Sequence, residues 1–165
     1  MKNYVKEGQK LPMFGIGPAL IFGVGLVNAL CIVLFVYVFK IGELNGIFVL
    51  MFKIVGVILI ILGLVVWFIG ALRSDMDASI TENRLKTDGI YSWVRNPMYS
   101  GWWLALTGIS FMWHNIFLIP AFFVNWGMMT IVLVNTEEKW LSDLYGAEYE
   151  EYKKHVNRCI PFKRS

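Results

Sequence analysis

The sequence predicts an all-α integral membrane protein with four long transmembrane helices, paired as two helical hairpins, and a cytosolic C-terminal amphipathic helix. Hydrophobic residues make up 57% of the 165-residue chain and charged residues only 16%, whereas a soluble domain is closer to a quarter charged. Four apolar runs, separated by turns and polar segments, account for this composition. The length suits one domain, so residues 1–165 are expected to form a single membrane domain.

The first hairpin is expected within residues 1–72. Residues 14–39 and 47–72 are apolar runs of 26 residues each, and at ~1.5 Å per residue a helix of that length crosses a bilayer. A short turn with Gly42 and Gly46 separates them. In the second run Gly56, Gly63 and Gly70 recur every seven residues. That spacing puts them on one face, which predicts a seam where a neighbouring helix packs closely.

The second hairpin is expected in the remainder, residues 73–165. Residues 98–113 and 116–134 are apolar runs separated only by His114 and Asn115, and Pro120 falls near a helix start, where its missing N–H costs least. The connection over residues 73–97 is polar. At that length it is expected to carry function or local structure of its own.

The distribution of Lys and Arg predicts the orientation in the membrane. Residues 1–11 carry three, the connection over 73–97 carries four, and the tail from Lys139 carries six, whereas the two turns between paired helices carry Lys40 alone. By the positive-inside rule both termini and the 73–97 connection face the cytosol. The connection and the tail are therefore expected on the same side, where they can meet. The expected location is a bacterial or archaeal inner membrane.

The tail after the last apolar run has the pattern of an amphipathic helix. Trp140, Leu141, Leu144 and Tyr145 fall at helical spacing, and Gly146 is a natural break before the pattern resumes. We expect this segment to lie against the membrane face, beside the polar connection.

Two segments carry the residues with chemistry. The first, Leu85–Gly101, combines Tyr91, Arg95, Asn96 and Tyr99; the second, from Glu137 onward, combines Glu137, Glu138, Tyr149, Tyr152 and Arg158. Carboxylates and aromatic faces suit a cationic group, and an arginine suits a carboxylate or phosphate. Together they predict a cytosol-facing site for a zwitterionic ligand.

Other chemistries are disfavoured by the residues present. His and Cys show no metal-ligand spacing, and no phosphate-binding or dinucleotide-binding glycine motif occurs. Cys31 and Cys159 lie far apart, so a disulfide is not expected. The net charge of +3 is too small and dispersed to indicate a nucleic-acid partner.

The motifs resemble those of the isoprenylcysteine carboxyl methyltransferase family, within the wider group of membrane methyltransferases that includes phospholipid N-methyltransferases. The resemblance rests on G-I-Y-S-W-V-R-N-P-M-Y-S-G, then a hydrophobic hairpin, then E-E-K-W-L-S-D-L-Y-G-A-E-Y-E-E-Y and a closing R-C-I-P. It covers about residues 83–161. It implies S-adenosylmethionine as the methyl donor, S-adenosylhomocysteine as the product, and no metal.

The resemblance also implies the site residues. Cofactor binding falls to Asn83, Arg84, Leu85, Lys86, Tyr91, Asn96, Pro97, Met98, Tyr99 and Glu137, and the catalytic group to Arg95, Asn96, Tyr99 and Glu138. Glu138 and Tyr99 are the proton acceptors that an amine or hydroxyl acceptor would need.

Two positions depart from the family pattern. Asn96 stands where the family has histidine, and Leu133 stands where the eukaryotic carboxyl methyltransferases place an arginine that serves the substrate carboxylate. The expected activity is methyl transfer to a small or lipid-like hydrophobic acceptor in contact with membrane lipids. The alternatives are phospholipid or amine N-methylation, and a non-catalytic membrane protein that retains the fold. The sequence leaves the oligomeric state open.

Overall fold

The computed structural model describes residues 16–72 and 84–160, which are helical apart from their connections. The long helices are α1 (Gly17–Ile32, extended by the π-helical η1, Val33–Val38), α2 (Ile47–Leu72), α4 (Pro97–Met112) and α5 (Ile119–Asn135). Shorter elements are the 3₁₀ turns η2 (Gly89–Ser92) and η3 (Ile116–Leu118) and the helices α6 (Glu137–Tyr145) and α7 (Ala147–His155). Within the described ranges the only β-type pairs are two isolated bridges.

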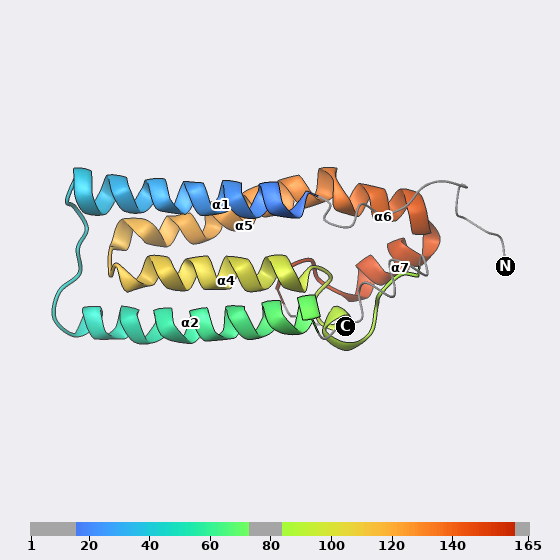
Figure 1. Cartoon of the computed structure of the whole chain (residues 1–165), viewed down its shortest axis with the longest axis horizontal. Helices are drawn as coiled ribbons and strands as arrows, with labels where there is room; N and C mark the ends of the chain where they lie inside the picture. The colour runs from blue at the N-terminus through green and yellow to red at the C-terminus, as the bar shows by residue number, and fades with distance from the viewer. Residues whose placement is uncertain (1–15, 73–83, 161–165) are drawn as a thin grey trace.

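The all-helical membrane class is confirmed, but with three candidate spans among the described residues. They cover Gly17–Val38, Ile47–Ala71 and Ile116–Tyr145. The helix expected as the third span is α4, which has 16 residues and is shorter than these three. It nevertheless runs alongside the other long helices (Figure 1). Its role as a fourth span stays a proposal.

A glycine seam joins α2 to α4, as the seven-residue repeat predicts. A Cβ on Gly63 would lie 2.5 Å from the carbonyl oxygen of Gly101, and a Cβ on Gly56 would lie 2.8 Å from that of Gly108. The third glycine of the repeat, Gly70, meets the ring of Pro97. Because glycines let the two backbones approach each other directly, α2 and α4 are in close contact along most of their length.

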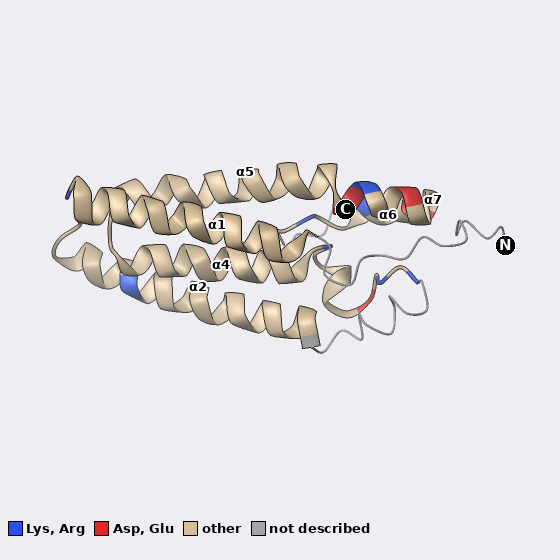
Figure 2. Cartoon of the chain, turned by 45° about the horizontal axis from the view of Figure 1, so that its top comes forward, with Lys and Arg blue, Asp and Glu red and all other residues tan. Residues whose placement is uncertain are grey.

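The first helix packs elsewhere. α1 contacts α4 and α5, and the buried cluster between these three helices includes Leu20, Val24, Trp103, Met129 and Leu133. α1 and α2 are joined in sequence through residues 39–46 but lie on different sides of α4 (Figures 1 and 2). The expected N-terminal pair is thus separated in space, because the glycine face of α2 matches the glycine face of α4.

The tail forms two helices at one end of the bundle. α6 and α7 meet at Gly146, whose φ of 54° is a conformation that favours glycine. The expected helix broken at Gly146 is confirmed. Charged side chains gather at this end, whereas the long helices are almost uncharged (Figure 2). A cytosolic position for these helices stays a proposal.

Candidate functional site at the end of the bundle

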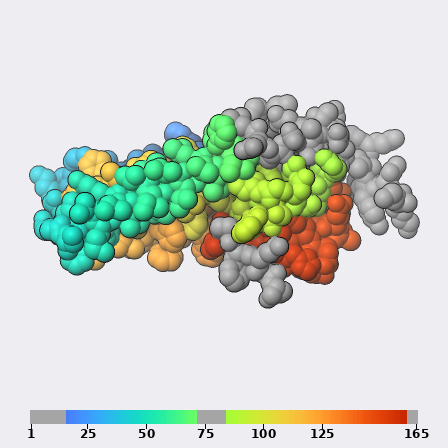
Figure 3. Space-filling view, turned by 90° about the horizontal axis from the view of Figure 1, so that it is seen from below, coloured from blue at the N-terminus to red at the C-terminus, as the bar shows by residue number. Residues whose placement is uncertain are grey.

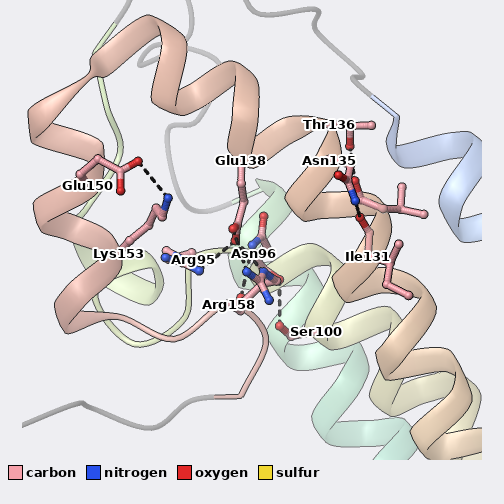
Figure 4. Close-up of polar contacts among 11 residues, drawn as sticks. Arg95, Asn96, Ser100, Ile131, Asn135, Thr136, Glu138, Glu150, Lys153 and Arg158 are labelled. Atoms are coloured by element: carbon pink, nitrogen blue, oxygen red, sulfur yellow. Dashed lines mark hydrogen bonds and ion pairs between the residues drawn. The ribbon is translucent and has the colours of Figure 1, made fainter.

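The two segments singled out in the sequence meet at this end. Val94 and Asn157 form a parallel bridge, the Arg95 amide donates to the Asn157 carbonyl at 2.9 Å, and the Asn96 amide donates to the Arg158 carbonyl at 3.0 Å. We call residues 156–160 the C-terminal strap. Its pairing with residues 94–96 brings the motif before α4 against the end of the chain (Figure 4).

Glu138 lies at the centre of the site between two arginines. Its carboxylate accepts hydrogen bonds from Arg95 Nη2 at 2.9 Å, from Arg158 Nε at 2.7 Å and from Arg158 Nη2 at 2.9 Å. The Glu138 and Arg95 side chains are only 5% and 7% exposed. Figure 4 shows all three side chains pointing toward one another from α6, the segment before α4 and the strap. The triad carries one net positive charge, because two guanidinium groups face one carboxylate.

The neighbouring carboxylate has a different partner. The Tyr99 hydroxyl donates to Glu137 Oε1 at 2.5 Å, which joins the first turn of α4 to the first turn of α6. Gly17 lies beside this pair, since a Cβ on it would come within 3.0 Å of Tyr99 Oη. The start of α1 therefore closes one side of the Tyr99–Glu137 pair.

Three further tyrosines surround the triad. Tyr91 is buried and its hydroxyl donates to the Gly70 carbonyl at 3.4 Å, while the Tyr91 carbonyl accepts from the Tyr152 hydroxyl at 2.5 Å. Tyr149 is 1% exposed. Burial raises the pKa of both Tyr149 and Tyr152 far above the ordinary value, so both phenols stay neutral at physiological pH.

A cavity of about 480 Å³ opens beside the triad, and we call it the polar cavity because four of its eight lining residues are charged or carry an amide. Its walls are Arg95, Trp126, Lys153, Val156, Asn157, Arg158, Cys159 and Ile160. Two buried polar atoms nearby, Arg95 Nε and Tyr149 Oη, have no hydrogen-bond partner in the protein. Buried polar groups are normally satisfied, so these two donors indicate a place for a ligand.

Cys159 closes the cavity on the side of α4. Burial raises the pKa of its thiol to about 11, and a hydrogen bond with Ser100 acts on the pKa in the opposite direction. The thiol is therefore protonated near neutral pH and is a poor nucleophile.

Comparison with known proteins identifies the family to which this chain belongs. The family model described as Phospholipid methyltransferase matches residues 45–148, from just before α2 into α7. The chain belongs to the phospholipid methyltransferase family. The kinship with membrane methyltransferases expected from the motifs is thereby confirmed.

The curated relatives match a shorter stretch. Protein-S-isoprenylcysteine O-methyltransferase of Tribolium castaneum is 32% identical over 82 residues, which is 50% of this chain and 29% of the relative. The protein of that name from Saccharomyces cerevisiae is 36% identical over 84 residues, 50% of this chain and 34% of the relative. Methanethiol S-methyltransferase 1 of Bradyrhizobium diazoefficiens is 36% identical over 85 residues, 52% of this chain and 29% of the relative. The matches thus span about a third of these relatives. No solved structure matches the chain.

The structure brings some of the residues implied by the family together and leaves others apart. Arg95, Asn96, Tyr99, Glu137 and Glu138 converge, as described above. Pro97 begins α4 and is buried against α2, and Met98 beside it is partly buried. Asn83 lies outside the described residues.

The segment before η2 lies further from the triad. Leu85 packs against a cluster formed by Leu144, Tyr145 and Tyr149 under α6 and α7. Lys86 forms an ion pair with Asp88 at 2.8 Å, and Arg84 is exposed. Leu85 therefore reaches the site through Tyr149, whereas the ion pair of Lys86 joins two residues of the same segment.

Sequence reasoning did not include Lys153, Asn157 or Trp126 among the site residues, although all three line the polar cavity. Lys153 belongs to a charged run, which predicts a solvent-exposed helix face. Nothing in the neighbouring sequence indicates that Lys153 lines a cavity. The one usable signal was the closing R-C-I-P motif, which includes Arg158 and follows Asn157 directly. Within the described part of the chain, no three or more His, Cys, Asp or Glu side chains are grouped so that they could hold a metal ion.

Proposed function

We propose that the protein transfers a methyl group from S-adenosylmethionine to a hydrophobic acceptor at the cytosolic face of the membrane. The observation that carries this proposal is the polar cavity beside the Arg95–Glu138–Arg158 triad, with unpartnered donors on Arg95 and Tyr149. Membership of a methyltransferase family sets the reaction class. The polar cavity and the two unpartnered donors support this location for the site.

The residues present fit the cofactor. Its carboxylate is suited to the net positive triad and to the free Nε of Arg95, because a guanidinium binds a carboxylate with paired donors. Its ammonium is suited to Glu137, and its sulfonium to the face of the partly exposed Tyr152 ring. Bound S-adenosylmethionine would supply an electrophilic methyl group and leave as the neutral thioether S-adenosylhomocysteine.

The contribution of the protein is then mostly positioning. Holding the methyl donor and the acceptor in line provides a large part of the decrease in the activation barrier for methyl transfer. Glu138 already binds two guanidinium groups, so it serves as their counter-ion. If the acceptor must lose a proton, Glu137 is the better-placed proton acceptor, since its carboxylate accepts hydrogen bonds from the neutral Tyr99 hydroxyl and the Ile16 amide and not from guanidinium groups.

Asn96 occupies the position at which the family has a histidine. Its side-chain amide donates to the Arg158 carbonyl at 3.4 Å, and its backbone carbonyl accepts from the Ser100 hydroxyl at 2.8 Å. A neutral amide in that position can hold the strap and contact a ligand, but it cannot carry a proton between groups. We assign Asn96 a positioning role.

The acceptor group is not the same throughout the relatives. The names of the beetle and yeast proteins specify an isoprenylcysteine, and that of the bacterial protein specifies methanethiol. In this chain Leu133 is fully buried in the core cluster, in the place where the resemblance puts an arginine for a substrate carboxylate. A phospholipid or amine acceptor, which needs no such arginine, is the second candidate, favoured by the description of the family.

Calorimetry on the purified full chain in detergent tests the cofactor assignment. Wild-type protein should bind S-adenosylmethionine and S-adenosylhomocysteine. Glu137→Gln should weaken S-adenosylmethionine binding by about tenfold or more, since it removes the counter-charge to the ammonium. Glu151→Gln is the matched control, because Glu151 is exposed on α7 and pairs only with Lys154 and His155 there.

Two results would count against the proposal. Absence of binding of either compound to the wild-type protein would remove the enzymatic function. Equal affinities for Glu137→Gln and wild type would move the ammonium site away from α6.

A further inference from the structure

The start of α1 contacts the site at Glu137. The backbone amide of Ile16, the residue before α1, donates a hydrogen bond to the Glu137 carboxylate. Gly17, the first residue of α1, lies against Tyr99, since a Cβ on it would be 3.0 Å from Tyr99 Oη. That hydroxyl in turn donates to Glu137 Oε1 at 2.5 Å. The start of α1 and the first turn of α4 therefore each donate one hydrogen bond to the same carboxylate.

This contact comes from a helix to which family membership assigns no role. The family model matches residues 45–148, whereas α1 ends at Ile32. Glu137 is the first residue of α6, directly after the end of α5. Partners outside its own helix are therefore needed to orient its carboxylate, and α1 supplies one of them.

A second polar contact joins α1 to α4 deep in the bundle. Ser110 Oγ donates to Asn28 Oδ1 at 2.9 Å, and Asn28 Nδ2 donates to the Val24 carbonyl at 2.9 Å. Ser110 is 2% exposed and Asn28 is 4% exposed. Burying such groups is costly unless they are hydrogen-bonded, so this bond favours one alignment of the two helices over the others.

The two contacts between α1 and α4 have the same register. Asn28 and Ser110 are 82 positions apart in the sequence, which is also the separation of Gly17 from Tyr99. On each helix the two contact residues are 11 positions apart, which is about three turns and ~16 Å along the axis. Since α1 and α4 both begin at the site end of the bundle (Figure 1), a single alignment satisfies both contacts.

The seam between α2 and α4 does not fix this alignment. On the face drawn in Figure 3, α2 lies in front and little of α1 is visible. α1 meets α4 instead through apolar side chains that include Trp103 and Leu106. Apolar contacts have little directional preference, so the Asn28–Ser110 bond is the contact suited to specify how far α1 extends toward the site.

We propose that α1 is part of the cofactor site. The Asn28–Ser110 bond sets the register of α1, and the start of α1 then positions Glu137 for the ammonium group of S-adenosylmethionine. This inference rests on the proposed methyl transfer and adds three positioning residues to it, Gly17, Asn28 and Ser110. They act through Glu137 and Tyr99 and do not themselves touch the ligand.

Gly17→Ala tests the contact at the site. The new Cβ would crowd Tyr99 Oη and move it from Glu137, so calorimetry on the full chain in detergent should show S-adenosylmethionine binding about three- to tenfold more weakly. In a Tyr99→Phe background the crowded atom is absent, and the nearest remaining ring atom is 3.7 Å from the Cβ. Adding Gly17→Ala there should cause no further loss. Gly23→Ala, which meets no atom within 4 Å, should bind like wild type.

Ser110→Ala tests the register. It removes the hydroxyl that bonds α1 and should weaken S-adenosylmethionine binding about threefold or more, although Ser110 is about three turns from Tyr99. Thr107→Val is the matched control, because Thr107 is equally buried on α4 but its hydroxyl donates to the Trp103 carbonyl of the same helix at 2.8 Å. Its affinity should equal that of the wild type.

A double variant separates positioning from general loosening of the bundle. If the register acts through Glu137, Ser110→Ala should cause no further loss of affinity in a Glu137→Gln background. A general loss of packing would reduce the affinity by the same factor in both backgrounds.

Hydrogen exchange followed by NMR gives a measurement that does not need the cofactor. In the unliganded protein Glu137→Ala and Ser110→Ala should both make the Ile16 amide exchange several-fold faster, because each removes a contact that holds it. Thr107→Val and Glu151→Ala should leave this rate unchanged, since neither residue bonds to α1.

The possible failures are distinguishable. If the wild type binds S-adenosylmethionine and both Gly17→Ala and Ser110→Ala bind it equally well, the positioning role of α1 is wrong and the proposed function stands. Additive losses for Ser110→Ala and Glu137→Gln, or a Gly17→Ala effect that persists beside Tyr99→Phe, would also overturn it. If the wild type binds no cofactor, the proposed function fails together with the positioning role, whatever the hydrogen exchange shows.

Discussion

Glu138 is the residue whose role the structure alters most. The family resemblance places it among the catalytic residues, where a carboxylate is expected to accept a proton. In the structure its two oxygens hold Arg95 and Arg158, and the side chain is almost fully buried. A carboxylate in this position neutralises one of two buried guanidinium groups and fixes both. The arrangement keeps a single positive charge beside the polar cavity.

Glu138→Gln should therefore destabilise the protein. The substitution leaves two buried guanidinium groups without their counter-charge, and removing one partner of a buried pair costs about 3–5 kcal/mol. The measurement is the midpoint of thermal unfolding in detergent.

Two companion variants make this prediction specific. Glu151→Gln breaks only exposed pairs on α7 and should not shift the midpoint. Adding Arg158→Gln to Glu138→Gln should recover part of the loss, because it removes one of the two unpaired guanidinium groups and returns the net charge of the group from +2 to the wild-type +1. A midpoint equal to that of wild type for Glu138→Gln would mean that the triad is not formed.

At the scale of elements, the contact between α2 and α4 is the most specific packing in the bundle. It depends on glycines from both helices that meet backbone to backbone, at Gly63 with Gly101 and at Gly56 with Gly108. The same contact holds Pro97, the first residue of α4, against Gly70. Because Arg95 and Asn96 precede Pro97 directly, the seam also sets the position of the site.

Gly63→Ala should destabilise the α2–α4 contact. The new Cβ would lie 2.5 Å from the Gly101 carbonyl and 2.6 Å from the Ala105 amide, and neither backbone atom can move without shifting α4. Overpacking of this kind costs about 1–3 kcal/mol, measured as the unfolding free energy in mixed micelles.

Gly23→Ala on α1 serves as the control for that variant. A Cβ at Gly23 would have no neighbour within 4 Å, so the substitution should be neutral or stabilising through helix propensity. If both variants behave alike, the helices do not approach as closely as the structure has them.

At the scale of the whole molecule, chemistry is concentrated at one end. The polar cavity and the triad lie where α6 and α7 cap the bundle, and most of the charged residues of the described part of the chain are there as well (Figure 2). The opposite end holds the connection over residues 39–46 and the turn at His114 and Asn115. The charge distribution led us to propose that the chemical end faces the cytosol.

Cysteine labelling tests this orientation. In a variant with Cys31 and Cys159 replaced by serine, Asn45→Cys and Thr87→Cys place single exposed thiols at opposite ends of the bundle. In intact cells a membrane-impermeant maleimide should modify residue 45, and it should modify residue 87 only after permeabilisation. The reverse pattern would place the site outside the cell and contradict the positive-inside argument.

Much of this architecture can be predicted from local properties of the chain. The bounds of α2 agree with its apolar run, because hydrophobic length sets a membrane helix. The break at Gly146, the turn at His114 and the glycine seam follow from residue type and spacing in the same way. The number of Lys and Arg residues in each polar segment predicts that the Arg95 segment and the tail lie at the same end of the bundle.

The other features of the protein depend on contacts between helices and segments that are far apart in the sequence. The sequence by itself determined an all-helical membrane protein with a motif-rich end, since hydropathy and motif spacing are local properties. The separation of α1 from α2, the pairing of Glu138 with two arginines and the pairing of residues 94–96 with the strap required the fold. Each depends on partners that are far apart in the sequence, such as 20 positions for Glu138 with Arg158 and 82 for Asn28 with Ser110, and no periodicity or composition records such partners.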